Sequence, residues 1–363
     1  MKRIGRQVLL LPTGQGNPRN GEGAFLRLKD GSILFCYTEY VGDSWADHAS
    51  AHLACYRSRD EGESWGEHRI LIEKPESAKN VMSVSLMRMA NGDIGLFYIR
   101  KNADGTDTIC LARSQDEGEH FAEPIECLSC LERQDYYVLN NDRILRLRSG
   151  RLLMPLARHS IYEADHAFAP GVICFLVSDD DGRSWRKTEQ ELIPPSEFTA
   201  TGNGYEEPGL YQFENGEIWC YIRTSFGRQF QAFSRDGGES WSGVRSHPFF
   251  TSPDSPMLVK RFGARTFAVF NPYARSYHTP HQELWGRTPL ALAVSTDDGR
   301  SFTREQTLLL EEDDTNSYCY PALIEGEGYL LCAYYHSNNT GRVLNATKIV
   351  KITEQELACA LSR

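Results

Sequence analysis

Ser58-Arg-Asp-Glu-Gly-Glu-Ser-Trp65 carries the pattern Ser-x-Asp-x-Gly-x-x-Trp/Phe, and the same pattern occurs four more times along the chain. The serines of successive copies are 56, 64, 56 and 61 residues apart. This near-constant spacing indicates an internal structural repeat of about 60 residues. The other four copies are Ser114–Phe121, Ser178–Trp185, Ser234–Trp241 and Ser295–Phe302.

Each copy of this box has the composition of a tight turn. Ser and Asp side chains bond to nearby backbone N–H groups, and glycine supplies a positive φ. The aromatic residue is suited to packing against a neighbouring sheet. We therefore expect all five boxes to be structural, and we place no box aspartate in a functional site.

A second periodicity runs in phase with the boxes, because short apolar segments follow glycine-containing turns at Gly31, Gly92, Gly150, Gly216 and Gly326. A sixth apolar segment lies at 265–270. Each unit then holds four short strands separated by turns, which is typical of a β-meander. Six such units predict an all-β fold, a six-bladed β-propeller of four-stranded antiparallel blades that spans residues 1–363 as a single domain.

The two ends of the chain have separate predictions. The last unit lacks a box, so we expect the segment Arg6–Leu11 to supply its outer strand and close the ring. Helical periodicity is almost absent, and the one candidate helix is 354–361.

Composition limits the possible partners. Lys and Arg number 39 and Asp and Glu number 49, so the net charge is −10. This charge disfavours binding to nucleic acid or to an anionic membrane, and no apolar run is long enough for a membrane span. The N-terminal apolar stretch is too short for a signal peptide, which predicts a cytoplasmic protein with buried, reduced cysteines. We predict no metal and no cofactor, and the sequence leaves the oligomeric state open.

Five boxes in a chain of six units resemble the Asp-box, or sialidase (neuraminidase), superfamily of six-bladed propellers. The resemblance covers essentially the whole chain. It implies a tyrosine nucleophile paired with a glutamate, an aspartate that acts as acid and base, and three arginines that hold the carboxylate of the sugar.

The glutamate and two of the arginines have matching segments. The segment 207–223 resembles the family pattern in which Glu, a strand, an Asn-Gly turn, a second strand and Arg follow one another, which implies roles for Glu207 and Arg223. Glu206 is adjacent, and strand alternation predicts that only one of the two glutamates reaches the site. Arg287 lies eight residues before a box serine, like the third arginine of the family.

The nucleophile and the acid are expected near the two ends of the chain. The segment Tyr320-Pro-Ala-Leu323 leads into the last turn and resembles the family's tyrosine region, with Tyr318 as the rival. The loop that leads to the first box should hold the acid/base, for which we choose Asp47, with Asp43 as second choice.

The first arginine departs from the family, whose members carry an Arg-Ile-Pro motif before the first turn. Here that region reads Asn17-Pro-Arg19-Asn-Gly-Glu22. Arg19 lies two residues away from the expected position, Glu22 would oppose an anionic substrate, and Arg143 of the third unit is another inward candidate.

The resemblance therefore implies a retaining exo-glycosidase that hydrolyses a terminal acidic sugar such as sialic acid from a glycoconjugate. A glycosidase of the same fold that acts on a non-sialic sugar is the first alternative. A non-catalytic carbohydrate-binding propeller is the second. In each case the partner is a carbohydrate.

Overall fold

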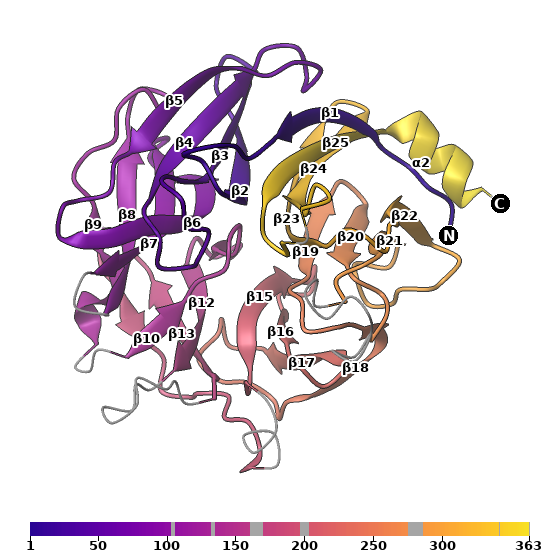
Figure 1. The fold of residues 1–363 in the computed structure, drawn as a ribbon. Helices are drawn as coiled ribbons and strands as arrows, with labels where there is room; N and C mark the ends of the chain where they lie inside the picture. The colour runs from indigo at the N-terminus through magenta and orange to yellow at the C-terminus, as the bar shows by residue number, and fades with distance from the viewer. Residues whose placement is uncertain are drawn as a thin grey trace.

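In the computed structural model the chain forms six antiparallel β-sheets that lie as blades around a central axis (Figure 1). The predicted six-bladed propeller is therefore confirmed. The first strand of each blade lies nearest the axis, and the inner strands of blades 1 and 2, 1 and 6, 4 and 5, and 5 and 6 contact each other. The structure describes residues 1–102, 106–131, 135–159, 170–196, 203–274, 286–340 and 342–362.

The strands follow the order of the chain from blade 1 to blade 6, with one short extra strand in blade 3. Blade 1 holds β2 (Asn20–Arg27), β3 (Ile33–Tyr40), β4 (Ala51–Ser58) and β5 (Gly66–Ile72). Blade 2 holds β6 (Ala78–Arg88), β7 (Ile94–Asn102), β8 (Asp107–Ser114) and β9 (Ile125–Glu126), followed by the 3-10 helix η1 (Cys127–Cys130). Blade 3 holds β10 (Tyr136–Val138), β11 (Leu145–Arg146), β12 (Leu152–His159), β13 (Val172–Ser178) and β14 (Arg186–Lys187). Blade 4 holds β15 (Glu206–Gln212), β16 (Ile218–Arg223), β17 (Arg228–Ser234) and β18 (Arg245–Thr251). Blade 5 holds β19 (Leu258–Phe262), β20 (Arg265–Phe270), β21 (Leu290–Ser295) and β22 (Thr307–Glu311).

Blade 6 combines both ends of the chain. It holds β23 (Tyr318–Gly326), β24 (Tyr329–His336), β25 (Ala346–Thr353) and, as its outer strand, β1 (Arg6–Leu11). Strand β1 pairs antiparallel with β25, with Leu11 opposite Thr347 (Figure 1). The expectation that the N-terminal segment closes the ring is confirmed, and this pairing covers an edge of β25 that would otherwise be exposed.

The C-terminal helix is also where the sequence places it. Helix α2 (Glu354–Leu361) begins at Thr353, whose hydroxyl accepts a hydrogen bond from the Glu356 N–H group. Leu357 is buried against blades 5 and 6. None of the helices in the described part of the chain has the length and apolar character needed to cross a bilayer.

The five boxes form the turns between the third and fourth strands of blades 1 to 5. In the first, the Ser58 hydroxyl donates to Asp60 Oδ1 at 2.9 Å and accepts from the Gly62 N–H group at 2.8 Å. Asp60 Oδ1 also accepts from the N–H group of Ser64. The same three contacts recur in every copy, so the boxes are structural turns.

The box glycine is needed for more than its backbone conformation. Gly62 has φ +81°, and a Cβ atom there would lie 2.7 Å from Leu331 of blade 6. Gly238 has φ +91°, and its Cβ would lie 2.9 Å from Leu153 of blade 3. Each of these turns thus packs directly against the preceding blade, and only glycine satisfies both demands.

The hydrophobic core lies between blades. Leu34 of β3 and Leu96 of β7, for example, are fully buried in one cluster shared by blades 1 and 2. All ten cysteines are free thiols, and eight of them are buried. The apolar strands in which the sequence places most of them account for this burial.

Candidate functional site

Four inner strands carry an irregularity close to the central axis. The affected residues are Glu22 in β2, Ser83 in β6, Glu207 in β15 and Tyr320 in β23, with φ values of 54°, 63°, 39° and 54°. At each one the pairing with the neighbouring strand shifts register. A bulge of this kind redirects a side chain out of the regular alternation of the strand.

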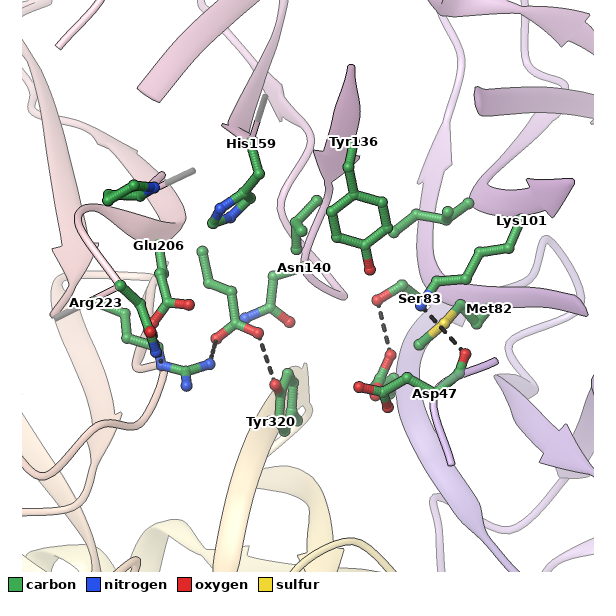
Figure 2. Close-up of a pocket in the computed structure, with 16 residues that line it drawn as sticks. Asp47, Met82, Ser83, Lys101, Tyr136, Asn140, His159, Glu206, Arg223 and Tyr320 are labelled. Atoms are coloured by element: carbon green, nitrogen blue, oxygen red, sulfur yellow. Dashed lines mark hydrogen bonds and ion pairs between the residues drawn. The ribbon is translucent and has the colours of Figure 1, made fainter. Parts of the chain in front are cut away.

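All four of these side chains line one cavity of about 390 Å³ at the axis (Figure 2). Two cations, Lys101 and Arg223, and four acidic residues face it. The complete lining consists of Glu22, Asp47, Met82, Ser83, Ile99, Lys101, Tyr136, Val138, Asn140, His159, Pro170, Asn203, Glu206, Glu207, Arg223 and Tyr320. In the described ranges no group of three or more His, Cys, Asp and Glu residues is arranged to hold a metal ion.

A hydrogen-bonded chain joins Tyr320, Glu207 and Arg223. The Tyr320 hydroxyl donates to Glu207 Oε1 at 2.6 Å, and Arg223 Nη1 donates to Glu207 Oε2 at 2.5 Å. Burial and the Glu207 charge hold the pKa of Tyr320 well above its ordinary value, while Arg223 and Arg287 act in the opposite direction. A phenol within hydrogen-bond reach of a carboxylate has the geometry of a nucleophile beside its base.

Asp254 is a residue that sequence reasoning missed. Its Oδ1 accepts from Arg223 Nε at 2.6 Å, and its backbone oxygen accepts from Arg287 Nε at 3.0 Å. It lies just before β19, the inner strand of blade 5. Its place shortly before an inner strand is the only signal that the sequence offers for it, and the contact with Arg223 is what identifies it.

Arg287 lies behind the tyrosine. Its side chain is fully buried, and its guanidinium carbon is 5.6 Å from the centroid of the Tyr320 ring. Nη1 donates to the Cys319 sulfur at 3.3 Å. The structure therefore places a positive charge close to the ring of the phenol.

Arg19 is bound on two sides by carboxylates. It donates to Glu22 Oε1 and to Asp47 Oδ1, each at 2.5 Å, and its Nε donates to the Tyr335 hydroxyl at 2.8 Å. Burial raises the pKa of Glu22 against the opposing pull of Arg19. Removal from water would raise the pKa of Asp47 as well. The positive charges of Arg19 and Lys101 outweigh this effect and lower the pKa of Asp47 to about 2.

The loop that carries Asp47 is fixed through its backbone. Asn80 Nδ2 donates to the Asp47 carbonyl at 2.8 Å, and Lys101 Nζ donates to the same oxygen at 3.2 Å. Lys101 lies near the end of the second strand of blade 2, as Arg223 does in blade 4. That correspondence within the repeat is a signal that sequence reasoning did not use.

The structure brings Asp47, Glu207, Tyr320, Arg19, Arg223 and Arg287 together around this cavity. The prediction that only one of the adjacent glutamates reaches it was wrong, because the bulge in β15 breaks strand alternation and Glu206 lines the cavity as well (Figure 2). Burial raises the pKa of Glu206, although Arg223 opposes this.

Three other candidates lie elsewhere. Tyr318 is buried against the rings of Tyr334 and His336. Asp43 is exposed and does not line the cavity. Arg143 is not brought to this cavity, because the interrupted inner strand of blade 3 directs its side chain into a second cavity.

Comparisons with known proteins agree with this architecture. The sequence profile described as "BNR repeat-like domain" matches residues 46–332. The structure is similar to that of an intramolecular trans-sialidase from Ruminococcus gnavus, with a TM-score of 0.73 and 15% identity, covering 96% of this chain and 97% of the other. It is also similar to a Trypanosoma rangeli sialidase in complex with 2,3-difluorosialic acid, described as a covalent intermediate. There the TM-score is 0.73 and the identity 14%, covering 99% of this chain and 60% of the other.

One curated protein matches by sequence over a shorter stretch. "Anhydrosialidase" from Macrobdella decora is 31% identical over 94 residues, which is 26% of this chain. The match spans only 10% of the length of that relative. The solved structures are too distant in sequence to show more than the fold.

Proposed function

Because the chain belongs to the BNR repeat-like domain family and has a sialidase-like propeller, we propose that it is a retaining exo-glycosidase with Tyr320 as its nucleophile. The observation that carries the proposal is the hydrogen bond of 2.6 Å from the Tyr320 hydroxyl to Glu207. A neutral phenol approaches an anomeric carbon beside a carboxylate group without the repulsion that a carboxylate nucleophile would meet.

The first step forms a covalent glycosyl-enzyme. Glu207 accepts the phenolic proton as the Tyr320 oxygen bonds to the anomeric carbon, and the bond to the leaving oxygen breaks. Arg223 and Arg287 favour this step, because both stabilise the developing phenolate. Asp47 protonates the leaving oxygen as general acid.

The second step reverses the roles. Asp47, now a carboxylate, takes a proton from water, and the water oxygen attacks the anomeric carbon. The bond to Tyr320 breaks and Glu207 returns the proton to the phenol. The two inversions at the anomeric carbon give net retention of its configuration. In the free site Arg19 holds Asp47 in its ionised form, so the proton needed for the first step must arrive with substrate binding.

The proposed substrate is a terminal acidic sugar such as sialic acid. Arg223, Arg287 and Arg19 would hold its carboxylate, because guanidinium groups bind carboxylates in a bidentate manner. The sialidase and trans-sialidase names of the structural neighbours support this choice, and so does the covalent intermediate described for the Trypanosoma rangeli enzyme.

A specific observation favours a second candidate, a glycosidase of the same mechanism for a neutral sugar. Glu22 and Asp47 already bind Arg19. Arg19 and Arg287 are also absent from the cavity lining. A sugar without a carboxylate would leave the ion pairs of Arg19 with Glu22 and Asp47 undisturbed.

The test is hydrolysis of fluorogenic aryl glycosides of N-acetylneuraminic acid, of uronic acids and of neutral sugars. Turnover of an acidic sugar that is lost in Tyr320→Phe supports the first proposal. Turnover of neutral sugars alone supports the second candidate. Saturable glycan binding without turnover would overturn both and indicate a carbohydrate-binding propeller.

A further inference from the structure

A second cavity of about 360 Å³ lies further along the same inner strands. In β15, Glu207 lines the first cavity, whereas Tyr211 and Gln212 line the second. At 3.3 Å per residue, Glu207 and Tyr211 are about 13 Å apart along the strand. In β6, Ser83 lines the first cavity and Leu86 lines the second. The second cavity is therefore a separate site nearer the box-bearing face of the propeller.

Arg143 is the central feature of this cavity. Its side chain lines the cavity yet is only 3% exposed. Nη1 donates to the Tyr221 hydroxyl at 3.1 Å and Nη2 to the Met257 carbonyl at 2.6 Å, so both acceptors are neutral. Nε is buried and has no hydrogen-bond partner in the described part of the chain.

A buried guanidinium without a counter-ion is costly, because burial removes its hydration and no carboxylate replaces it. Asp142 lines the same cavity, but it pairs with Lys260 at 2.6 Å. Among the described residues, no carboxylate lies within ion-pair distance of Arg143. The charge of Arg143 thus remains available to a ligand.

Three more arginines line the cavity, and two of them are paired with carboxylates. Arg146 pairs with Asp181, and Arg261 pairs with Glu214. Arg148 lines the cavity and donates to the backbone oxygen of Glu214, and in the described ranges no carboxylate forms an ion pair with it. Among the described residues, buried Arg143 and exposed Arg148 are therefore without an acidic partner, in a protein whose net charge is −10.

We propose that this second cavity binds a small molecule through a phosphate or carboxylate group, with Arg143 as the main binding residue and Arg148 as a second one. A volume of about 360 Å³ is within the usual range for small-molecule sites. Guanidinium groups bind oxyanions through charge-assisted hydrogen bonds, and the unpartnered Nε of Arg143 is one such donor. The site does not depend on the glycosidase proposal.

The test measures the melting temperature and, by isothermal titration calorimetry, the dissociation constant with inorganic phosphate, acetate and glucuronate. Sodium chloride at matched ionic strength is the reference. We expect saturable stabilisation by at least one oxyanion. Stabilisation by phosphate alone identifies a phosphate site. Stronger stabilisation by glucuronate than by acetate identifies a sugar-acid site. Stabilisation no greater than that by chloride overturns the proposal.

Three variants assign the binding to the second cavity. Arg143→Met should raise the dissociation constant about tenfold or more, since it removes a charged hydrogen-bond donor. Arg148→Ala, at an exposed position that tolerates substitution, should raise it about fivefold. Arg304→Met, at another exposed arginine, is the matched control and should leave it unchanged. If Arg143→Met does not fold, Arg148→Ala decides. Wild-type affinity in either of the first two variants overturns the proposal, because the anion would then be bound at the first cavity or elsewhere.

Discussion

Replacing Tyr320 with phenylalanine removes one oxygen atom and with it the hydrogen bond to Glu207 Oε1. Glu207 keeps its contact with Arg223 through the other oxygen. Leaving one oxygen of a buried carboxylate without its donor costs about 1–3 kcal/mol. A chain of 363 residues has an unfolding entropy of about 760 cal/mol/K, so the melting temperature should fall by about 1–4 °C.

The effect on turnover should be far larger than the effect on stability. Without the phenolic oxygen no glycosyl-enzyme forms, and kcat should fall about 10³-fold or more. The assay is hydrolysis of the best aryl glycoside of the panel, with melting followed by circular dichroism. Tyr318→Phe is the matched control, because Tyr318 is two residues away on the same strand and is buried outside the cavity.

Two results would refute this reasoning. Turnover by Tyr320→Phe within tenfold of wild type would show that another group is the nucleophile. An equal loss in Tyr318→Phe would show that the assay reports damage to β23 rather than removal of a reacting atom.

Four further predictions concern acidic residues. Asp47→Asn should slow an alkyl glycoside about 10²–10⁴-fold but an aryl glycoside less, because a phenolate leaves without protonation; the ratio of the two kcat/KM values measures this. Glu22→Gln should raise kcat/KM for an acidic sugar relative to a neutral one, since it frees a donor of Arg19, and a shift in the opposite direction would contradict our assignment. Burial raises the pKa of Glu206, so the stability that this group contributes is fully present below the ordinary carboxyl pKa and is lost as pH rises through the raised pKa. Glu206→Gln should therefore make the free energy of unfolding, measured by urea titration at a series of pH values, decline less over this range. Asp180→Ala, in the third box, should lower the free energy of unfolding by about 1–2 kcal/mol in urea without changing turnover.

The fold was predictable because its signals are local and repeated. Each box combines a polar turn, a glycine and an aromatic residue within eight positions, and five copies in phase leave few alternative architectures. Ring closure by Arg6–Leu11 followed from the missing box of the last unit. The pairing of β1 with β25 bears this out.

The site was less predictable because its details depend on backbone irregularities. Strand alternation implied that Glu206 and Glu207 point to opposite faces, and the bulge in β15 brings both to the cavity. The direction of Arg143 depends on the interruption of the inner strand of blade 3. Asp254 carries no motif of its own, and its contact with Arg223 comes from packing between blades 4 and 5.

The strained residues of the inner strands bear on whether the first cavity has a function. Left-handed backbone costs a residue with a side chain about 1–2 kcal/mol, so Glu22, Ser83, Glu207 and Tyr320 together cost about 4–8 kcal/mol. That is comparable to the whole stability of an ordinary domain. A blade does not require such strain, because β19 pairs with β20 in unbroken register. The strain therefore belongs to the polar side chains that face the cavity, which favours a working site there over a silent propeller.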